Sequence, residues 1–417
     1  MRTQKIVATI AIMRSRLVLG LILAIGFFLR IYRLDIPQNY IFDEVYHVPS
    51  IRAFSQNNPA AFDVYAQAPE PGTAYDWLHP PLAKLIQAGS VLVLGDNSFG
   101  WRFPSAVFGM LAIAAVYYLA LTVTGKIPIA LLAAALFSLD GLGLTMSRIA
   151  MNDIFVTTFI LFALAFFFKG FSFAKVKDNP YWIWCAVFTG LAISTKHSAV
   201  LLFPIFALQG LSSKAFKESP YWKLLYLVFI PALIYLLSFS QFWLQGHSFR
   251  QFVDLHKQIY YYQTHLTATH SYQSTAWQWP LLIRPVWFHV DYQPETIANI
   301  YNLGNPIIFW SGLLALIQGL SFANAKVNPY WYFLISYLGL WLPFLFSPRI
   351  MFLHHYLPAL AVLTVILAVW LDSFSKKTIT FIMIITVIFF SFFYSINTAI
   401  PLPTQWLKYW FWLPGWR

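Results

Sequence analysis

The chain has 417 residues, of which 59% are hydrophobic and only 10% are charged. Ordinary soluble domains are about 45–50% apolar, so this composition excludes a soluble globular fold. The net charge of +12 does not indicate a nucleic-acid-binding protein, because the basic residues are scattered between apolar segments and form no continuous basic stripe. The single cysteine, Cys185, excludes an intramolecular disulfide framework.

Apolar segments long enough to cross a membrane recur along the chain. A membrane-spanning helix needs about 20 apolar residues, and we expect about eleven such helices in one all-α integral membrane domain, 1–417. The first segment leads directly into Arg30 and Arg33 without a convincing cleavage site, so we interpret it as a retained anchor and not as a signal peptide. The shorter run Leu82–Leu94 is predicted to lie along the membrane surface. The predicted spans are 15–33, 100–123, 127–146, 151–170, 180–196, 198–212, 222–244, 304–322, 330–346, 353–371 and 379–398.

The charges between these segments predict an orientation. With the N-terminus in the cytoplasm, the inner loops receive most of the lysines, as the positive-inside rule expects. The segment 399–417 then lies outside, together with two long loops, 34–99 and 245–303. Long loops in compact proteins are usually functional, so the chemistry is expected on the outer face.

The first outer loop opens with two adjacent carboxylates, Asp43 and Glu44, close to the end of the first predicted span. Ionisable groups near the membrane are costly unless they have a function or a partner. A partly desolvated carboxylate is a stronger base, and it could take a proton from a hydroxyl group. The alternative, with about equal weight, is that the pair caps a surface helix or binds Arg30 or Arg33.

Several cations fall on the predicted outer face, where the positive-inside rule does not explain them. Their number suggests an anionic lipid head group, because Arg and Lys bind phosphate through charge-assisted hydrogen bonds. For any one of them alone, a side chain that reaches back to the membrane interface is the favoured explanation, whereas the set as a whole favours the phosphate. The cations are Lys84, Arg102, Arg148, Lys196, Arg284 and Arg349.

Two further groups of polar residues have less definite interpretations. Asp153 lies at the start of the fourth predicted span, where it either contacts a substrate or caps the helix. His354 and His355 are adjacent and would point to different faces of a helix, so they do not form a metal-binding pattern. We predict no metal and no cofactor.

A set of short motifs, in order from about residue 30 to the end, resembles the protein O-mannosyltransferase family in its bacterial form. Each motif alone is weak, but their order and spacing are specific. They are Phe42-Asp43-Glu44, His79-Pro80-Pro81-Leu82-Ala83-Lys84, Arg102-Phe103-Pro104-Ser105, Ser147-Arg148 to Asp153, Ser194-Thr195-Lys196, Trp279 to Pro285, Leu303-Gly304-Asn305-Pro306, His355-Tyr356-Leu357-Pro358-Ala359 and Trp412 to Trp416.

The resemblance implies a C-type glycosyltransferase architecture, with eleven spans and helices along the membrane in the first outer loop. It also implies a polyprenyl-phosphate-mannose donor, Ser or Thr acceptors on exported proteins, an inverting mechanism and a location in the plasma (inner) membrane. Asp43 would be the general base, with Glu44 beside it. Arg102 and Arg349 would be the main contacts of the donor phosphate, with Lys84 and Lys196 as weaker candidates. Arg148 and Asp153 would also bind the donor, and His79 and Tyr356 would be possible substrate contacts.

Alternatives remain at this point. The loop 245–303 is too short for the β-trefoil MIR domain that eukaryotic members carry there, which weakens the expectation of a protein acceptor. Sugar transfer to a lipid or glycan, as in enzymes resembling lipid A aminoarabinose transferases, is the nearest alternative. A lipid or solute transporter is a more distant one, supported mainly by Asp140 within the third predicted span. The oligomeric state is not predicted.

Overall fold

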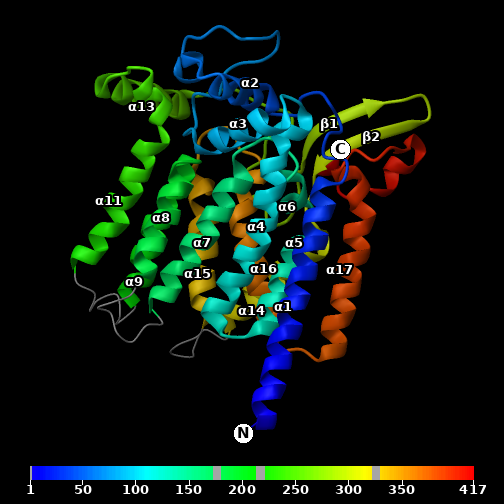
Figure 1. Ribbon diagram of the computed structural model, residues 1–417. Helices are drawn as coiled ribbons and strands as arrows, with labels where there is room; N and C mark the ends of the chain where they lie inside the picture. Colours follow the sequence, from blue (N-terminus) through cyan, green and yellow to red (C-terminus); the bar gives the residue numbers. More distant parts are fainter. Residues whose placement is uncertain (1, 172–179, 213–220, 322–328) are drawn as a thin grey trace.

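The computed structural model describes residues 2–171, 180–212, 221–321 and 329–417. Most of them form helices that run side by side in one bundle (Figure 1). The helices of the bundle are α1 (Arg2–Ile31), α4 (Ser98–Thr124), α5 (Ile127–Ser138), α6 (Gly141–Met146), α7 (Asp153–Phe171), α8 (Tyr181–Ile193), α9 (Leu202–Ser212), α11 (Tyr221–Ser238), α14 (Pro306–Ser321), α15 (Pro329–Trp341), α16 (Leu357–Leu371) and α17 (Lys376–Asn397).

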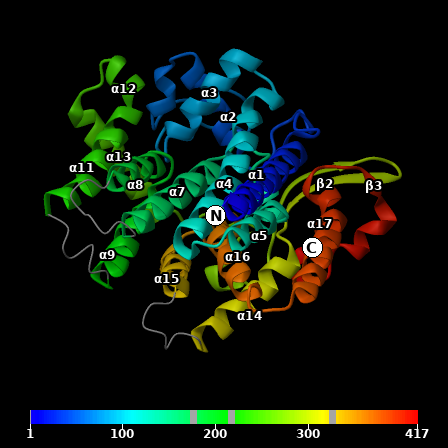
Figure 2. The same ribbon diagram turned by 60° about the horizontal axis from the view of Figure 1, so that its bottom comes forward.

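Helix α16 lies in the centre of the bundle and packs against α5, α7, α14 and α15 (Figure 2). Its sequence is apolar on all sides and nearly all of its side chains are buried. A helix that is hydrophobic all round has no face to present to water, so it occupies the core.

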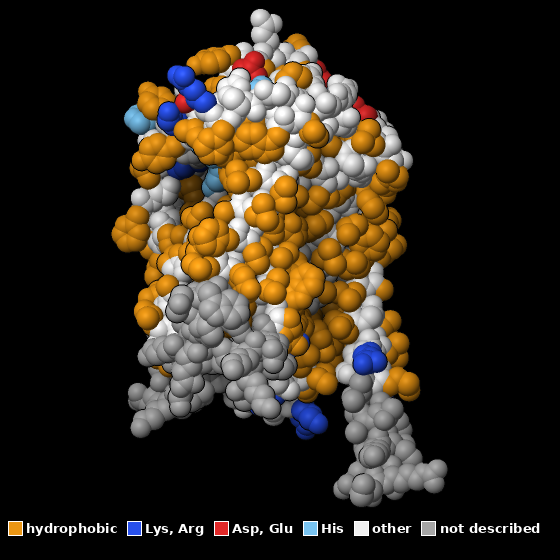
Figure 3. All heavy atoms as spheres, turned by 60° about the vertical axis from the view of Figure 1, so that its left-hand side comes forward, with side chains coloured by type: hydrophobic (Ala, Val, Ile, Leu, Met, Phe, Trp, Pro, Cys, Tyr) orange, Lys and Arg blue, Asp and Glu red, His pale blue; other side chains and the backbone are white. Residues whose placement is uncertain are grey.

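The composition of the helices is that of a membrane protein. Four helical segments in the described residues are long and apolar enough to cross a membrane. The remaining helices of the bundle are shorter but also apolar. Hydrophobic side chains cover the flank in Figure 3, while charged side chains lie near its two ends. The four long segments are Ser98–Thr124, Asp153–Gly170, Leu353–Leu371 and Lys376–Asn397.

Each predicted span contains a helix, but the seventh one, 222–244, is divided into α11 and α12 (Ser240–Leu244), and the third one, 127–146, is broken into α5 and α6 at Asp140. The Asp140 carboxylate accepts hydrogen bonds from the backbone N–H of Gly143 at 2.8 Å and of Asn305 at 2.9 Å. Asp140 is therefore the N-cap of α6, which satisfies backbone donors that would otherwise be unpaired. This capping role explains why a carboxylate lies within the third predicted span, which was the observation that supported a transporter.

The two long connections meet at one end of the bundle, called here the loop end (Figure 1). The first connection contains α2 (Glu44–Ser55), η1 (Pro59–Phe62) and α3 (Leu82–Leu94), the last with the bounds of the predicted surface helix. The second connection follows α12 (Ser240–Leu244) and contains α13 (Phe249–His265) and η4 (Ala276–Gln278). Shorter turns precede or follow the bundle helices at this end: η3 (His197–Leu201), η5 (Leu342–Phe346) and η6 (Leu353–Tyr356).

A small sheet at the loop end departs from the expected all-α fold. Strands β1 (Val286–Tyr292) and β2 (Thr296–Asn302) form an antiparallel hairpin with a bulge between Trp287 and His289. The short strand β3 (Leu402–Pro403), from the C-terminal segment, pairs with β2. Strands of this length are too short to register in a search for apolar runs of about 20 residues, so hydropathy did not detect them.

The C-terminal segment, with η7 (Thr404–Tyr409) and η8 (Pro414–Trp416), is held against the second connection. The Trp416 indole is buried and donates to the carbonyl of Leu282. Arg284 donates to the carbonyl oxygens of Gly415 and Arg417 at 3.0 and 2.9 Å. Arg284, one of the cations expected outside, thus fixes the end of the chain.

A buried ion pair holds the first connection on the bundle. Arg102, near the start of α4, binds Glu44, the first residue of α2, at 2.7 Å, and both side chains are almost fully buried. The Glu44 carboxylate also accepts the backbone N–H groups of Ile41 and Ala150 at 3.0 and 2.9 Å. Arg102 further donates to three backbone carbonyls between residues 34 and 39. The pair therefore joins α2, α4 and the chain before α7.

Arg148 closes the end of α1 in a similar way. Its guanidinium group donates to the carbonyls of Arg30, Tyr32 and Arg33 at 2.7, 2.9 and 3.1 Å. The last carbonyls of a helix have no partner within the helix, and a cation both satisfies them and opposes the negative end of the helix dipole. Both terminal nitrogens of Arg148 are thereby engaged in the scaffold.

The ion pair of Glu44 and Arg102 leads to a prediction about stability. Replacing Arg102 by methionine leaves a buried carboxylate without its counter-ion, which typically costs about 3–5 kcal/mol. We expect Arg102→Met to lower the melting temperature of the detergent-solubilised protein by several degrees.

The matched control is Lys257→Met, which removes an exposed ion pair with Asp254 on α13. Exposed pairs contribute about 0–1 kcal/mol, so this variant should melt close to the wild type. Equal melting temperatures for both variants would contradict an anchoring role for the buried pair.

Candidate active site

A cavity of about 330 Å³ lies at the loop end, where the two long connections meet the bundle. Titratable side chains from four separate parts of the chain line it. They are Asp43, His47 and His79 from the first connection, Asp153 from the start of α7, Lys196 and His197 from the turn between α8 and α9, and Arg349, His354 and His355 from the segment before α16.

Phe42 positions Asp43 at the edge of this cavity. The backbone of Phe42 has φ of 47°, a left-handed conformation that is strained for a bulky residue. Aromatic rings on both sides hold it there: Phe288 of β1 stacks on it at 4.5 Å and Phe352 meets it edge-on at 5.5 Å. The chain therefore turns sharply just before Asp43, and α2 starts directly after it.

The carboxylate of Asp43 lies among charges but has no hydrogen-bond or ion-pair partner in the described part of the chain. Burial raises the pKa of Asp43 to about 7, the nearby carboxylates of Asp153 and Asp76 add to this increase, and Lys196 opposes it. A carboxyl group with a pKa near neutrality, and with its oxygens free, is suited to accept a proton from a substrate.

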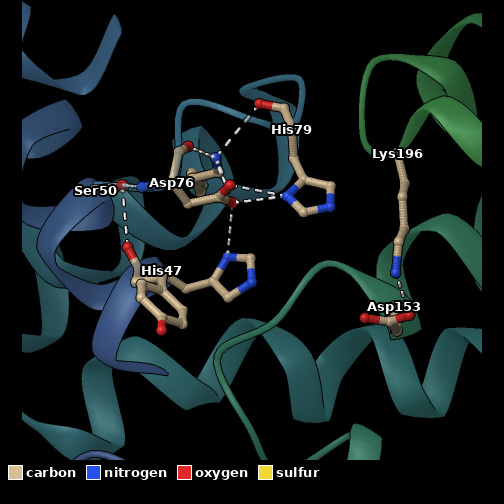
Figure 4. Close-up of polar contacts among 8 residues, drawn as sticks. His47, Ser50, Asp76, His79, Asp153 and Lys196 are labelled. Carbon is tan, nitrogen blue, oxygen red and sulfur yellow. Dashed lines mark hydrogen bonds and ion pairs between the residues drawn. The ribbon is translucent and has the colours of Figure 1, made fainter. Parts of the chain in front are cut away.

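Asp76 is the centre of a second cluster, on the wall of the cavity (Figure 4). Its carboxylate binds Lys84 at 2.8 Å and His79 at 2.9 Å, and Nδ1 of His47 lies 3.2 Å away without forming a hydrogen bond among the described residues. Burial alone would raise the pKa of Asp76, but the surrounding basic groups hold this pKa well below its ordinary value. The backbone N–H of Asp76 is also bound, to the Ser50 hydroxyl at 2.7 Å.

The same environment keeps His47 neutral, because burial lowers its pKa to about 3 despite the adjacent carboxylate of Asp76. Lys84 is fully buried, and its ammonium group also donates to the carbonyls of Asp76 and His79. The cluster thus fixes the loop that carries His79, and Lys84 acts inside it and not in the cavity.

Asp153 and Lys196 form an ion pair of 2.7 Å on the opposite side of the cavity (Figure 4). Asp153 is the first residue of α7, and Lys196 precedes η3. Apolar side chains lie next to this pair, among them Val156, Leu340 and Phe344. A charged pair thus borders an apolar lining.

Arg349 differs from Lys196, the other lysine or arginine that lines the cavity, because no ion pair with Arg349 is found in the described part of the chain. It lines the cavity and also a second groove of about 650 Å³ that is formed largely by the polar segment 266–278. Its Nε atom is buried and has no hydrogen-bond partner among the described residues. A buried guanidinium nitrogen without a partner is costly, so this position favours an anionic ligand.

The structure thus separates the residues expected in the site. Asp43, His79, Asp153, Lys196 and Arg349 come together around the cavity. The others take part in contacts of the scaffold: Glu44 with Arg102, Arg148 with the end of α1, Lys84 with Asp76, and Tyr356 with the hydroxyl of Tyr337 at 2.8 Å.

Sequence reasoning also missed several residues of the site. Asp76 and His47 were not singled out, and His354 and His355 were considered only as metal ligands. The one available signal for Asp76 was its spacing of three residues from His79 within a polar loop. His197 follows Lys196 directly in the matched motif and gave no separate signal.

Comparison with known proteins identifies the family of this chain. Residues 20–244 match the family described as dolichyl-phosphate-mannose-protein mannosyltransferase. Residues 248–328 match the C-terminal four-transmembrane region of protein O-mannosyltransferase. The polyprenol-phosphate-mannose–protein mannosyltransferase of Corynebacterium glutamicum is 23% identical over 90% of this chain and 88% of its own length. The corresponding protein of Mycobacterium tuberculosis is 23% identical over 82% of this chain and 81% of its own.

Solved structures extend the likeness to the fold. One chain of the Saccharomyces cerevisiae protein O-mannosyltransferase Pmt1–Pmt2 complex, bound to the sugar donor, superposes with a TM-score of 0.81 at 15% identity, over 97% of this chain and 93% of that one. ArnT from Cupriavidus metallidurans, bound to undecaprenyl phosphate, gives a TM-score of 0.59 at 16% identity, over 88% of this chain and 62% of that one. The family match spans more than half of the sequence, and the chain belongs to the dolichyl-phosphate-mannose-protein mannosyltransferase family.

Proposed function

We propose that this protein transfers mannose from a polyprenyl-phosphate carrier to Ser or Thr hydroxyl groups of exported proteins, with inversion at the sugar. The observation that carries the proposal is the unpaired Asp43 carboxylate, whose pKa is near neutrality, in a cavity that also holds Arg349 and Lys196. Family membership and the names of the relatives support the same reaction.

In this reaction the acceptor hydroxyl oxygen attacks C1 of mannose, and its proton passes to Asp43. The bond between C1 and the phosphate oxygen breaks on the opposite side, and the electron pair leaves with the polyprenyl phosphate. Arg349 and Lys196 stabilise the charge that develops on this leaving group. A single displacement inverts the configuration, and no covalent enzyme intermediate is needed.

The surroundings of the cavity suit the two substrates. The apolar side chains next to the Asp153–Lys196 pair would accompany the start of the lipid chain. The polar groove along 266–278, which adjoins the cavity at Arg349, would receive the acceptor peptide. We assign Glu44, Arg102, Arg148 and Lys84 to the support of this site.

We further propose that eleven helical segments cross the plasma membrane, with the N-terminus in the cytoplasm and the loop end outside. The distribution of lysines supports this orientation. The second connection is filled by α13, η4 and the hairpin, so acceptor selection would rest on the membrane domain and its own loops.

The base assignment is tested by Asp43→Asn. An amide cannot accept the proton, and general-base catalysis typically contributes about 10²–10⁴-fold, so we expect kcat to fall by that factor while the donor still binds. The assay uses purified protein, radiolabelled polyprenyl-phosphate-mannose and a Ser/Thr-rich peptide.

Asp63→Asn is the control, because Asp63 is an exposed carboxylate of the same loop whose side chain contacts a backbone N–H. Transfer by Asp43→Asn at the wild-type rate would refute the base assignment. Label that appears on a lipid and on no peptide would refute the protein acceptor.

The pH profile follows from the raised pKa of Asp43. The base must be deprotonated, so kcat/KM should fall about tenfold per pH unit below about 7 and level off above it. This acidic limb should be absent in the residual activity of Asp43→Asn. A wild-type profile that stays flat down to pH 5 would show that the base has an ordinary carboxyl pKa.

Arg349 should contribute mainly to the binding of the lipid donor. Arg349→Ala removes a charged hydrogen-bond donor, which is commonly worth about 1.5–3 kcal/mol, so kcat/KM for the lipid donor should fall about 10–100-fold. Arg349→Lys should recover part of it. Arg250→Ala, which removes an exposed arginine on α13, is the control. An equal effect of both alanine variants would remove Arg349 from the donor site.

A further inference from the structure

A chain of three hydrogen-bonded side chains leads from the cavity to helix α13. His197 lines the cavity, and its Nε2 lies 2.9 Å from the hydroxyl of Tyr235 on α11. The same hydroxyl lies 2.6 Å from Nε2 of His256 on α13, and Nδ1 of His256 lies 2.8 Å from the carbonyl of Phe252. Neither His256 nor Tyr235 lines the cavity, and the proposed reaction does not use them.

The direction of each hydrogen bond follows from the last one. A carbonyl oxygen can only accept, so Nδ1 of His256 carries the proton and Nε2 of this neutral ring is an acceptor. Burial lowers the pKa of His256, which favours the neutral ring. Tyr235 must therefore donate to His256, and its oxygen accepts the proton of His197 Nε2.

This order fixes the tautomer of His197. With its proton on Nε2, the neutral ring has a bare lone pair on Nδ1. No hydrogen bond to this Nδ1 is found in the described ranges of the chain. Since Nε2 is engaged by Tyr235 and the ring lines the cavity, Nδ1 is the nitrogen available to a ligand, and it can only accept a hydrogen bond.

We propose that His197 Nδ1 accepts a hydrogen bond from a hydroxyl group of the transferred sugar, and that Tyr235 and His256 are positioning residues that hold the required tautomer. This inference rests on the proposed function. A phosphate diester oxygen carries no proton, so the lone pair of His197 Nδ1 would repel it, whereas the ammonium group of the preceding residue, Lys196, attracts it. Lys196 would thus bind the phosphate end of the donor, and His197 would bind the sugar end.

The arrangement also connects the second long connection to the chemistry. Helix α13 begins with a capping box at Ser248 and buries Phe252 and Leu255 on its inner side. His256 follows on the same inner side and reaches Tyr235. The position of α13 therefore determines whether the sugar meets a hydrogen-bond acceptor in the cavity.

Two substitutions at His197 separate its two nitrogens. The side-chain oxygen of asparagine reproduces the position of Nδ1, whereas the glutamine amide reproduces that of Nε2. We expect His197→Asn to retain kcat/KM within about threefold, and His197→Gln to lose roughly tenfold, as for one hydrogen bond. Tyr235→Phe should give an intermediate loss, and the exposed His265→Gln on α13 should have no effect.

The decisive measurement repeats the assay with monodeoxy-mannose donors. For one of these donors the difference between wild type and His197→Gln should vanish, because the contacted hydroxyl is missing. If His197→Gln loses the same factor with every donor, His197 contacts no sugar hydroxyl and the proposal is wrong. The same result is expected if His197 binds the acceptor hydroxyl instead. Equal activities of His197→Asn and His197→Gln would likewise overturn the proposal.

NMR of ¹⁵N-histidine-labelled protein reads the tautomer without any turnover. His197 should carry its proton on Nε2 in the wild type and lose this preference in Tyr235→Phe. A proton on Nδ1 in the wild type would refute the proposal. If the wild type transfers no mannose to any peptide, the proposed function fails, and the tautomer is still decided by this spectrum.

Discussion

The buried contact between Glu44 and Arg102 is the constraint on which the site depends. It joins the first residue of α2 to α4, and both partners use their remaining hydrogen-bonding atoms on backbone groups of the neighbouring chain. Charges removed from water are tolerated only when they are paired and fully hydrogen-bonded. Because Glu44 cannot move without breaking this network, the backbone of the preceding residue, Asp43, is held at the cavity.

Two adjacent carboxylates thus lie in opposite environments, which suit them to different functions. Glu44 is surrounded by donors, and its carboxylate is held in place as part of the scaffold. Asp43 has no such donors and lies near other carboxylates, so it binds protons more readily than an ordinary aspartate. The aromatic contacts of Phe42 complete this arrangement, since they hold a strained backbone conformation between the bundle and the hairpin.

Local signals carried much of the fold. The helix over Leu82–Leu94 and the helices in the predicted spans follow from apolar runs. Such a run is a local feature that can be read from consecutive residues without knowledge of the tertiary structure. The partner of a cation depends on the tertiary structure, and for that reason the sequence could not distinguish Arg148, which closes α1, from Arg349, which faces the cavity. Asp76 was missed because its partners Lys84 and His47 lie on different helices. The hairpin was missed because its strands are short.

The hairpin also has a part that the site does not use. Phe288 of β1 contacts Phe42 near the cavity, but the far end of the hairpin, from Asp291 to Glu295, is exposed. Exposed turns of this kind tolerate added chain, because lengthening them disturbs few contacts. The hairpin tip is therefore where a protein with this architecture can acquire an additional domain while its cavity remains intact, and an affinity tag or a fluorescent label can be placed there for the same reason.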